Sequence, residues 1–264
     1  MSNTVLSFNS VSVVRDGNAI LDGVEWNVTA DQRWVILGAN GAGKTTLVQL
    51  AAAASHPTSG TVTVLDEEVG KADLAELKPR IGYASSVLAG RIPKRETVLD
   101  VVMTAAYAVT GRWHEEYEEI DVRRAKRVLA EWKLDSLADR AFGTLSDGEK
   151  KRVQIARSVM TDPELLILDE PAASLDLGSR EELVTLLGGY ASDSRSPAMI
   201  VVTHHAEEIP IGFTHAMLLR DGAIVAAGEL AATLTSENLS ETFGLPIDVS
   251  SEGGRYTARA RPQE

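Results

Sequence analysis

Cysteine is absent from this chain of 264 residues, which rules out disulfide bonds, thiolate metal sites and cysteine nucleophiles. Long apolar runs are also absent. The longest candidate, residues 98–109, is interrupted by Asp100 and is shorter than the roughly 20 residues that a membrane-spanning helix needs. The first residues, MSNTVLSFNS, lack the basic start and the apolar run of a signal peptide. We therefore expect a cytoplasmic chain whose role at a membrane, if it has one, is peripheral.

An excess of positive charge is lacking too. The chain has 38 acidic and 26 basic residues, a net charge of -12, and its lysines and arginines are scattered along the sequence. Proteins that bind nucleic acid usually gather basic residues into a patch or stripe. We therefore expect no nucleic-acid partner. Hydrophobic residues make up 44% of the chain, which is enough to fill the core of one large domain.

Short aliphatic runs, each bounded by polar or turn residues, recur along the chain and alternate with helix-length segments. This pattern is typical of the α/β class, with a largely parallel, buried sheet and crossover helices. The runs are residues 34–37, 61–65, 165–168, 199–202 and 217–219. Closer to the N-terminus, residues 5–8, 11–14 and 24–28 are separated by turn-rich stretches and predict a small antiparallel region.

Four parts are expected along the chain. Residues 1–81 would form the antiparallel region and the first part of the core, and residues 146–228 the remainder of the core. Residues 82–145 contain no convincing strand and predict a helical insertion, since DVRRAKRVLAEWKL has helical apolar spacing. The core would close with a hairpin turned at Asp221-Gly222. Residues 229–264 would form a tail with one short helix.

A phosphate-binding loop is the strongest local signal. The segment GANGAGKT matches G-x-x-x-x-G-K-[ST] between a predicted strand and a predicted helix. Its glycines let backbone N–H groups point at phosphate oxygens, Lys44 adds a charge for the β and γ phosphates, and Thr45 can ligate Mg²⁺. A glycine-rich turn that only joins strand to helix is the alternative. The nucleotide-binding candidates are Gly38, Ala39, Asn40, Gly41, Ala42, Gly43, Lys44, Thr45 and Thr46.

Two further apolar strands end in polar residues at the expected ligand edge of the sheet. In LLILDEP, the apolar strand is followed by Asp169, which can hold Mg²⁺, and Glu170, which can act as general base toward water. MIVVTHH delivers His204, whose imidazole can contact the γ phosphate. Alone, the two acids could equally well begin the next helix. Together with the phosphate loop, they favour a catalytic site.

The stretch LSDGEKKR allows two interpretations. Ser146 followed three residues later by Glu149 predicts a capping box at the start of a helix. The free N–H groups of a helix start can also bind a phosphate, although Asp147 places a carboxylate among them.

These motifs, together with ASLD at residues 173–176, occur in an order that resembles the ATP-binding cassette (ABC) ATPases over nearly the whole chain. The resemblance implies a P-loop NTPase (RecA-like) α/β core with an N-terminal antiparallel β region and an inserted α-helical subdomain. It also implies a second ATP-binding subunit, so that a homodimer holds two ATP molecules, with Mg²⁺, in a head-to-tail arrangement. Water would attack the γ phosphate.

 

The roles implied by the resemblance fall on matching positions. Thr45 and Asp169 would serve Mg²⁺, Glu170 would be the catalytic base and His204 the switch. In the signature segment, residues 146–149, the expected contacts with the partner's γ phosphate come from Ser146 and Gly148. Asp176 would lie in the loop (D-loop) that ties the two sites together.

Three departures from the family pattern stand out. Arg15 replaces the aromatic residue that stacks on adenine in many members, and its planar guanidinium can also stack. Ser86 stands where the family usually has a glutamine that senses Mg²⁺ and the membrane subunit. In the signature segment, Asp147 and Glu149 replace a glycine and a glutamine.

The leading hypothesis is a homodimeric transport ATPase that docks on an integral membrane permease, similar to single-domain importer subunits for molybdate or iron chelates. Residues 96–113 of the helical insertion would form the docking groove, with an ordinary core helix as the equal alternative. A soluble ABC-type ATPase acting in assembly or repair without a permease is the second hypothesis. An unrelated P-loop kinase or GTPase would leave LSDGE and ASLD unexplained.

Overall fold

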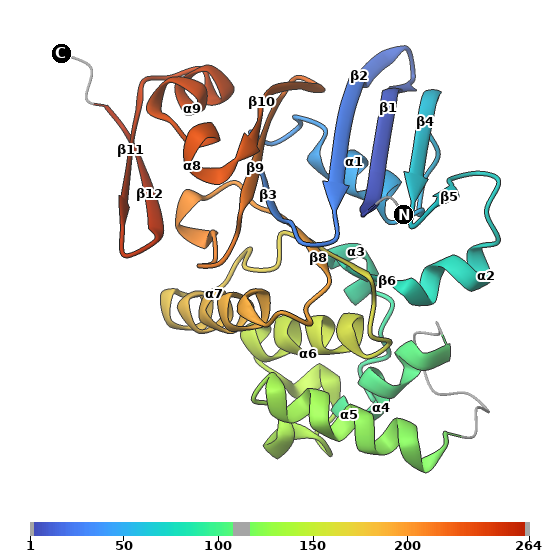
Figure 1. Cartoon of the computed structure of the whole chain (residues 1–264). Helices are drawn as coiled ribbons and strands as arrows, with labels where there is room; N and C mark the ends of the chain where they lie inside the picture. The colour runs from blue at the N-terminus through green and yellow to red at the C-terminus, as the bar shows by residue number, and fades with distance from the viewer. Residues whose placement is uncertain (1–2, 108–116, 262–264) are drawn as a thin grey trace.

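The computed structural model describes residues 3–107 and 117–261. Two larger sheets and a two-stranded C-terminal hairpin form the upper part of the molecule, and a group of helices lies below them (Figure 1). The six-stranded sheet separates two apolar cores, one shared with the small antiparallel sheet and the other with the helices. This arrangement confirms the expected α/β class with an antiparallel region and an inserted helical part.

The smaller sheet is antiparallel, with strand order β2-β1-β4-β5. Its strands are β1 (Thr4–Arg15), β2 (Asn18–Thr29), β4 (Ser59–Val64) and β5 (Glu67–Glu68). The two runs predicted at 5–8 and 11–14 belong to the single strand β1, which is irregular between Phe8 and Val11. β1 and β2 are joined at Asp16-Gly17, where both residues have positive φ, as a tight hairpin turn requires.

One strand assignment from the sequence was wrong. The run at 61–65 was expected in the parallel sheet, but β4 pairs antiparallel with β1, Val62 lying opposite Phe8. Only alternate residues at the end of β4 are buried, as befits a sheet that faces a core on one side.

The larger sheet has the order β10-β9-β3-β8-β7-β6. All of its strands except the edge strand β10 run parallel to one another. The strands are β3 (Arg33–Leu37), β6 (Ile81–Ala84), β7 (Leu165–Asp169), β8 (Ala198–Val202), β9 (His215–Arg220) and β10 (Ala223–Glu229). Every residue of β3, β7 and β8 is buried, which explains their unbroken apolar runs. The hairpin at Asp221-Gly222 is confirmed, since β10 pairs antiparallel with β9.

Helices connect the strands, and those between residues 98 and 192 form the lower part of the molecule, whereas α1 lies beside the strands in the upper part (Figure 1). They are α1 (Lys44–Ala51), α2 (Leu74–Leu77), α3 (Ser86–Ala89), α4 (Val98–Met103), α5 (Glu119–Glu131), α6 (Asp147–Val159) and α7 (Leu177–Ser192). Single 3₁₀ turns are η1 (Lys78–Arg80), η2 (Thr104–Tyr107), η3 (Asp135–Leu137), η4 (Phe142–Thr144) and η5 (Ala206–Glu208).

The helical insertion begins later than expected. Residues 82–145 were expected to contain no strand, but residues 82–84 belong to β6, the edge strand of the larger sheet. With four residues, including Gly82 and Tyr83, β6 has no aliphatic run to signal it. Gly82 is needed there because a Cβ would lie 2.4 Å from the carbonyl oxygen of Ser158.

The apolar stretch proposed as a docking groove is partly core. Val98, Val101, Val102 and Met103 of α4 are all buried against the helical core. Burial of each such side chain stabilises the fold by about 1.5–3 kcal/mol. These four side chains therefore follow the core alternative, and residues 108–113 of the stretch lie outside the described part of the chain.

The C-terminal tail contains more structure than the single short helix expected. It forms α8 (Leu230–Thr233), α9 (Ser236–Phe243) and a hairpin of β11 (Ile247–Glu252) and β12 (Arg255–Ala260), at the upper left of Figure 1. The hairpin turns at Gly253-Gly254, both with positive φ. Within the described residues, no helix is both long and apolar enough to cross a membrane.

Candidate nucleotide-binding and catalytic site

The predicted phosphate loop connects the end of β3 to the first turn of α1. Gly43 is the N-cap of α1, has a φ of 100°, and offers no side chain to cap the helix, so the N–H groups of the first turn stay available for an anion. A Cβ on Gly38 would lie 2.2 Å from the carbonyl oxygen of Leu219, and one on Gly43 would lie 2.7 Å from that of Ile20. Both glycines are therefore required by close backbone contacts.

Lys44 lies inside this loop. Its Nζ donates hydrogen bonds to the carbonyl oxygens of Gly38 at 2.7 Å and Ala39 at 3.0 Å, and the residue is only 5% exposed. Burial lowers the pKa of Lys44, while the carboxylates of Glu170 and Asp169 act in the opposite direction. An ammonium group has three N–H donors. Two of them hold the loop in shape, which leaves one for a phosphate oxygen.

Asp169, the last residue of β7, is suited to a hard cation. Its carboxylate is hydrogen-bonded to Thr45, the first-turn residue of α1, and burial raises its pKa. Its Oδ1 is buried and has no hydrogen-bond partner among the described residues. An unpartnered buried carboxylate oxygen is costly unless a ligand satisfies it, and carboxylate and hydroxyl oxygens are ligands that Mg²⁺ prefers. Thr45 and Asp169 therefore fit Mg²⁺.

Glu170 and His204 lie side by side at the ends of neighbouring strands. β7 and β8 are paired in parallel, with Asp169 opposite Val202, and the N–H of Glu170 donates to the Val202 carbonyl at 3.1 Å. The His204 Nδ1 is 3.6 Å from the Glu170 Oε1, and each side chain is about one third exposed. Glu170 has a φ of 51°, an uncommon backbone conformation that often occurs at functional sites.

Lys151 was not singled out from the sequence, yet it borders this acidic pair. It lies on α6, and its Nζ donates to the carbonyl oxygen of Glu170 at 3.1 Å. Burial lowers the pKa of Lys151, and the charges of Glu170 and Asp169 oppose that effect. The hydrogen bond supports the unusual backbone conformation of Glu170. Only the fold, which packs α6 beside β7, brings these residues together.

The signature segment forms the predicted capping box at the start of α6. The Ser146 Oγ accepts from the N–H of Glu149 at 3.3 Å, and Glu149 Oε2 accepts from the N–H of Ser146 at 2.7 Å. The side chain of Asp147 is 77% exposed and pairs with Lys150 at 3.2 Å. The carboxylate that seemed to oppose anion binding is therefore directed to solvent and partly neutralised.

The signature segment lies against the loop that contains Asp176. Asp176 is the N-cap of α7 and accepts a hydrogen bond from the N–H of Ser179 at 3.0 Å. A Cβ on Gly148 would lie 3.0 Å from the Ser179 side chain. Two motifs that are 28 residues apart in the sequence, at Gly148 and Asp176, are therefore joined through one serine.

The residue beside Asp169 at the end of β6 is Ser85, not Ser86. Ser86 is the first residue of α3 and is exposed. Ser85 is the buried N-cap of α3 and lines a small cavity with Asp169 and Lys151. The pairing of Ala84 with Leu168 explains this position, because the next residue on each strand is Ser85 and Asp169. Sequence reasoning missed Ser85 because the register of β6 was not predicted.

Arg15 ends β1 and is exposed, at the rim of a cavity that Gln49 and Tyr83 also line. An exposed guanidinium can stack on a base, as the sequence suggested. We expect Arg15→Ala to weaken ATP binding about two- to fivefold, the size of one exposed stacking contact. Titration of the protein with ATP measures this change, and the exposed Arg123 of α5, changed to Ala, serves as control. An unchanged affinity would remove Arg15 from the base site.

A glycine loop with lysine and threonine between a buried parallel strand and a helix, facing a carboxylate at the end of a second strand, defines a P-loop NTPase. The family model described as "ABC transporter" matches residues 21–173. A curated ABC transporter ATP-binding protein of Bacillus subtilis, YlmA, is 38% identical over 98% of this chain and 98% of its own length. The chain belongs to the family of ABC transporter ATP-binding proteins.

Other relatives and solved structures agree. The hemin import ATP-binding protein HmuV of Rhodococcus jostii is 30% identical over 92% of this chain and 81% of its own length. The solved structure of "an inward-facing conformation of a putative metal-chelate type ABC transporter" has the same fold, with a TM-score of 0.78, 24% identity, and coverage of 100% of this chain and 98% of that chain. The chain is accordingly an ATPase subunit of ABC type whose cofactors are ATP and Mg²⁺.

Proposed function

We propose that the chain forms a head-to-tail homodimer in which each ATP lies between the phosphate loop of one subunit and the signature segment of the other. The supporting observation is how Ser146, Gly148 and Asp176 are held. They contact one another through Glu149 and Ser179, and none of the hydrogen bonds described for the chain links them to residues 38–46 of the same subunit. The start of α6 is therefore not engaged by the phosphate loop of its own subunit, which supports its use by a nucleotide held by a second copy.

Within each site, the residues would divide the chemistry of hydrolysis. The N–H groups of the loop and Lys44 would hold the phosphates, and Thr45 and Asp169 would hold Mg²⁺, which neutralises phosphate charge when it is bound. Glu170 would accept a proton from the attacking water. His204, 3.6 Å away, would orient the Glu170 carboxylate and the water. Ser86 would stand at the position of the family's glutamine, while the buried Ser85, which lines a cavity with Asp169, would place a hydroxyl near the metal.

The subunit would act at the cytoplasmic face of a membrane by docking on an integral permease. Two groups of relatives, named hemin import and phosphonates import ATP-binding proteins, support an importer. Docking would involve the helical part, which we propose runs from the end of β6 at Ala84 to residue 145, between two segments of the ATPase core at 1–84 and 146–228. Residues 229–264 would form a separate tail.

Purification of the tagged protein from its native membrane tests this proposal. We expect a multi-span permease to co-purify in detergent, and ATP hydrolysis by the complex to respond to reconstitution in lipid. Recovery of only soluble partners, with no membrane protein, would contradict the transport function and favour an ABC ATPase that acts in assembly or repair. The same purification with the Glu170→Gln protein, whose subunits should stay associated in the presence of ATP, provides a comparison with the wild-type complex.

A further inference from the structure

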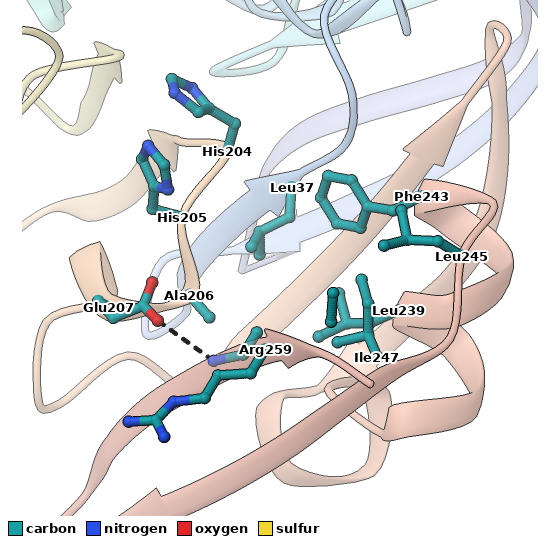
Figure 2. Close-up of a pocket in the computed structure, with 12 residues that line it drawn as sticks. Leu37, His204, His205, Ala206, Glu207, Leu239, Phe243, Leu245, Ile247 and Arg259 are labelled. Carbon is teal, nitrogen blue, oxygen red and sulfur yellow. Dashed lines mark hydrogen bonds between the residues drawn. The ribbon is translucent and has the colours of Figure 1, made fainter. Parts of the chain in front are cut away.

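The C-terminal hairpin contacts the segment that follows the switch histidine. η5 begins one residue after His205, and β12 packs against it. The N–H of Ala258 on β12 donates to the Glu207 Oε1 at 3.2 Å. Figure 2 shows this bond beneath His204 and His205. The contact therefore ties the C-terminal tail to the segment that follows His204.

Arg255, the first residue of β12, connects three elements through one guanidinium group. Nη1 and Nη2 donate to the two carboxylate oxygens of Glu181 on α7, at 2.9 and 3.3 Å. Nη2 also donates to the carbonyl oxygen of Glu207 on η5, at 2.6 Å. A bidentate arginine–carboxylate pair has a defined geometry, which a lysine cannot reproduce. Arg255 therefore fixes the distance between α7 and η5.

Both elements held by Arg255 belong to the candidate site. Asp176, the N-cap that precedes α7, lies five residues before Glu181. η5 follows directly on the strand end that carries His204. The structure thus joins the D-loop helix to the switch segment through a residue of the tail.

The switch segment borders a cavity on the side that faces the tail. His204 and His205 line a cavity of about 150 Å³ together with Leu239, Phe243 and residues of β12 (Figure 2). Side chains next to a cavity lack contact atoms on one side, so packing restrains them weakly. Ala206 and Ile209 of this segment are buried, and Thr203 is hydrogen-bonded to Glu208. On the cavity side, the polar contacts of Arg255 and Ala258 tie the segment to the tail.

We propose that Arg255 is a positioning residue for ATP hydrolysis: the tail hairpin holds η5 against α7 and thereby keeps His204 beside Glu170. The proposal rests on the proposed function, because it takes Glu170 as the base and His204 as the residue that orients it. The guanidinium of Arg255 is engaged by Glu181 and by the Glu207 carbonyl rather than by the residues proposed to hold ATP. Its removal should change kcat and leave ATP binding intact.

Steady-state hydrolysis and ATP titration of the purified full chain test this. We expect Arg255→Ala to lower kcat about tenfold, as expected for loss of charged hydrogen bonds, with the KM and Kd for ATP within about twofold of wild type. Arg255→Lys should recover part of the loss. The control is Arg261→Ala, which removes a 2.5 Å ion pair to Asp248 inside the same hairpin and should leave kcat unchanged.

A second pair of variants separates positioning from general stability. Glu181→Gln keeps the shape of the side chain but removes the charge that pairs with Arg255, and it should also lower kcat. This variant tests the positioning role if Arg255→Ala does not fold. In a His204→Ala background, Arg255→Ala should cause little further loss, because the two residues act through the same step. Equal kcat values for Arg255→Ala and Arg261→Ala, or a full tenfold loss in the His204→Ala background, would overturn the proposal. Normal hydrolysis by Glu170→Gln would instead overturn the proposed function.

Discussion

The Glu170→Gln protein is expected to hydrolyse ATP about 10²- to 10⁴-fold more slowly than wild type, the range typical for loss of a general base. Glutamine keeps the size of the side chain but cannot accept a proton. Its ATP affinity should be unchanged, since the phosphate loop and Asp169 remain. Phosphate release measures the rate, and gel filtration in ATP should show an accumulated dimer.

A matched change at an exposed glutamate controls for the loss of one negative charge. Glu237 is exposed on α9 and has no part in the candidate site, so Glu237→Gln should hydrolyse ATP at the wild-type rate. If Glu170→Gln turned over ATP as fast as this control, Glu170 would be excluded as the base.

Lys44→Ala should fail at an earlier step and bind ATP about a hundredfold more weakly, as expected when a charged hydrogen-bond donor is lost from a buried site. The change also removes the two hydrogen bonds to Gly38 and Ala39 that hold the loop. Titration with ATP and Mg²⁺ measures the affinity.

Lys126 offers a matched lysine on the exposed face of α5, and Lys126→Ala should bind ATP normally. The variant of the phosphate loop and the variant of the base should therefore have different defects: Lys44→Ala loses ATP binding, whereas Glu170→Gln keeps ATP binding and loses turnover. Wild-type affinity in Lys44→Ala would contradict the placement of the phosphates in residues 38–45.

The sequence was most informative where local chemistry determines the structure. A phosphate loop needs glycines at fixed spacing, and Gly38 and Gly43 do meet backbone atoms that exclude a Cβ. Buried parallel strands need unbroken apolar runs, so β3, β7 and β8 were evident. The capping box at Ser146 and the turn at Asp221-Gly222 likewise follow from neighbouring residues, and both were confirmed.

Features that depend on distant partners were not predictable. β6 and the tail hairpin are short and only partly apolar, and they become strands through pairing that no local pattern reveals. Ser85 reaches Asp169 through the register of two strands, Lys151 reaches Glu170 through the packing of α6, and Arg255 reaches Glu181 across 74 residues of sequence. The side-chain chemistry of each residue could be read from the sequence, but the residue that it contacts could not.

Mixing Lys44→Ala subunits with Ser146→Ala subunits tests most directly whether two copies share each site. In a mixed dimer, the phosphate loop of the Ser146→Ala subunit meets the intact signature segment of the Lys44→Ala subunit, so one site carries neither change. ATP hydrolysis should be nearly absent in either variant alone. We predict that it returns on mixing, in proportion to the fraction of subunits that form mixed dimers. No recovery, with mixed dimers shown to form, would contradict a site completed by the second subunit.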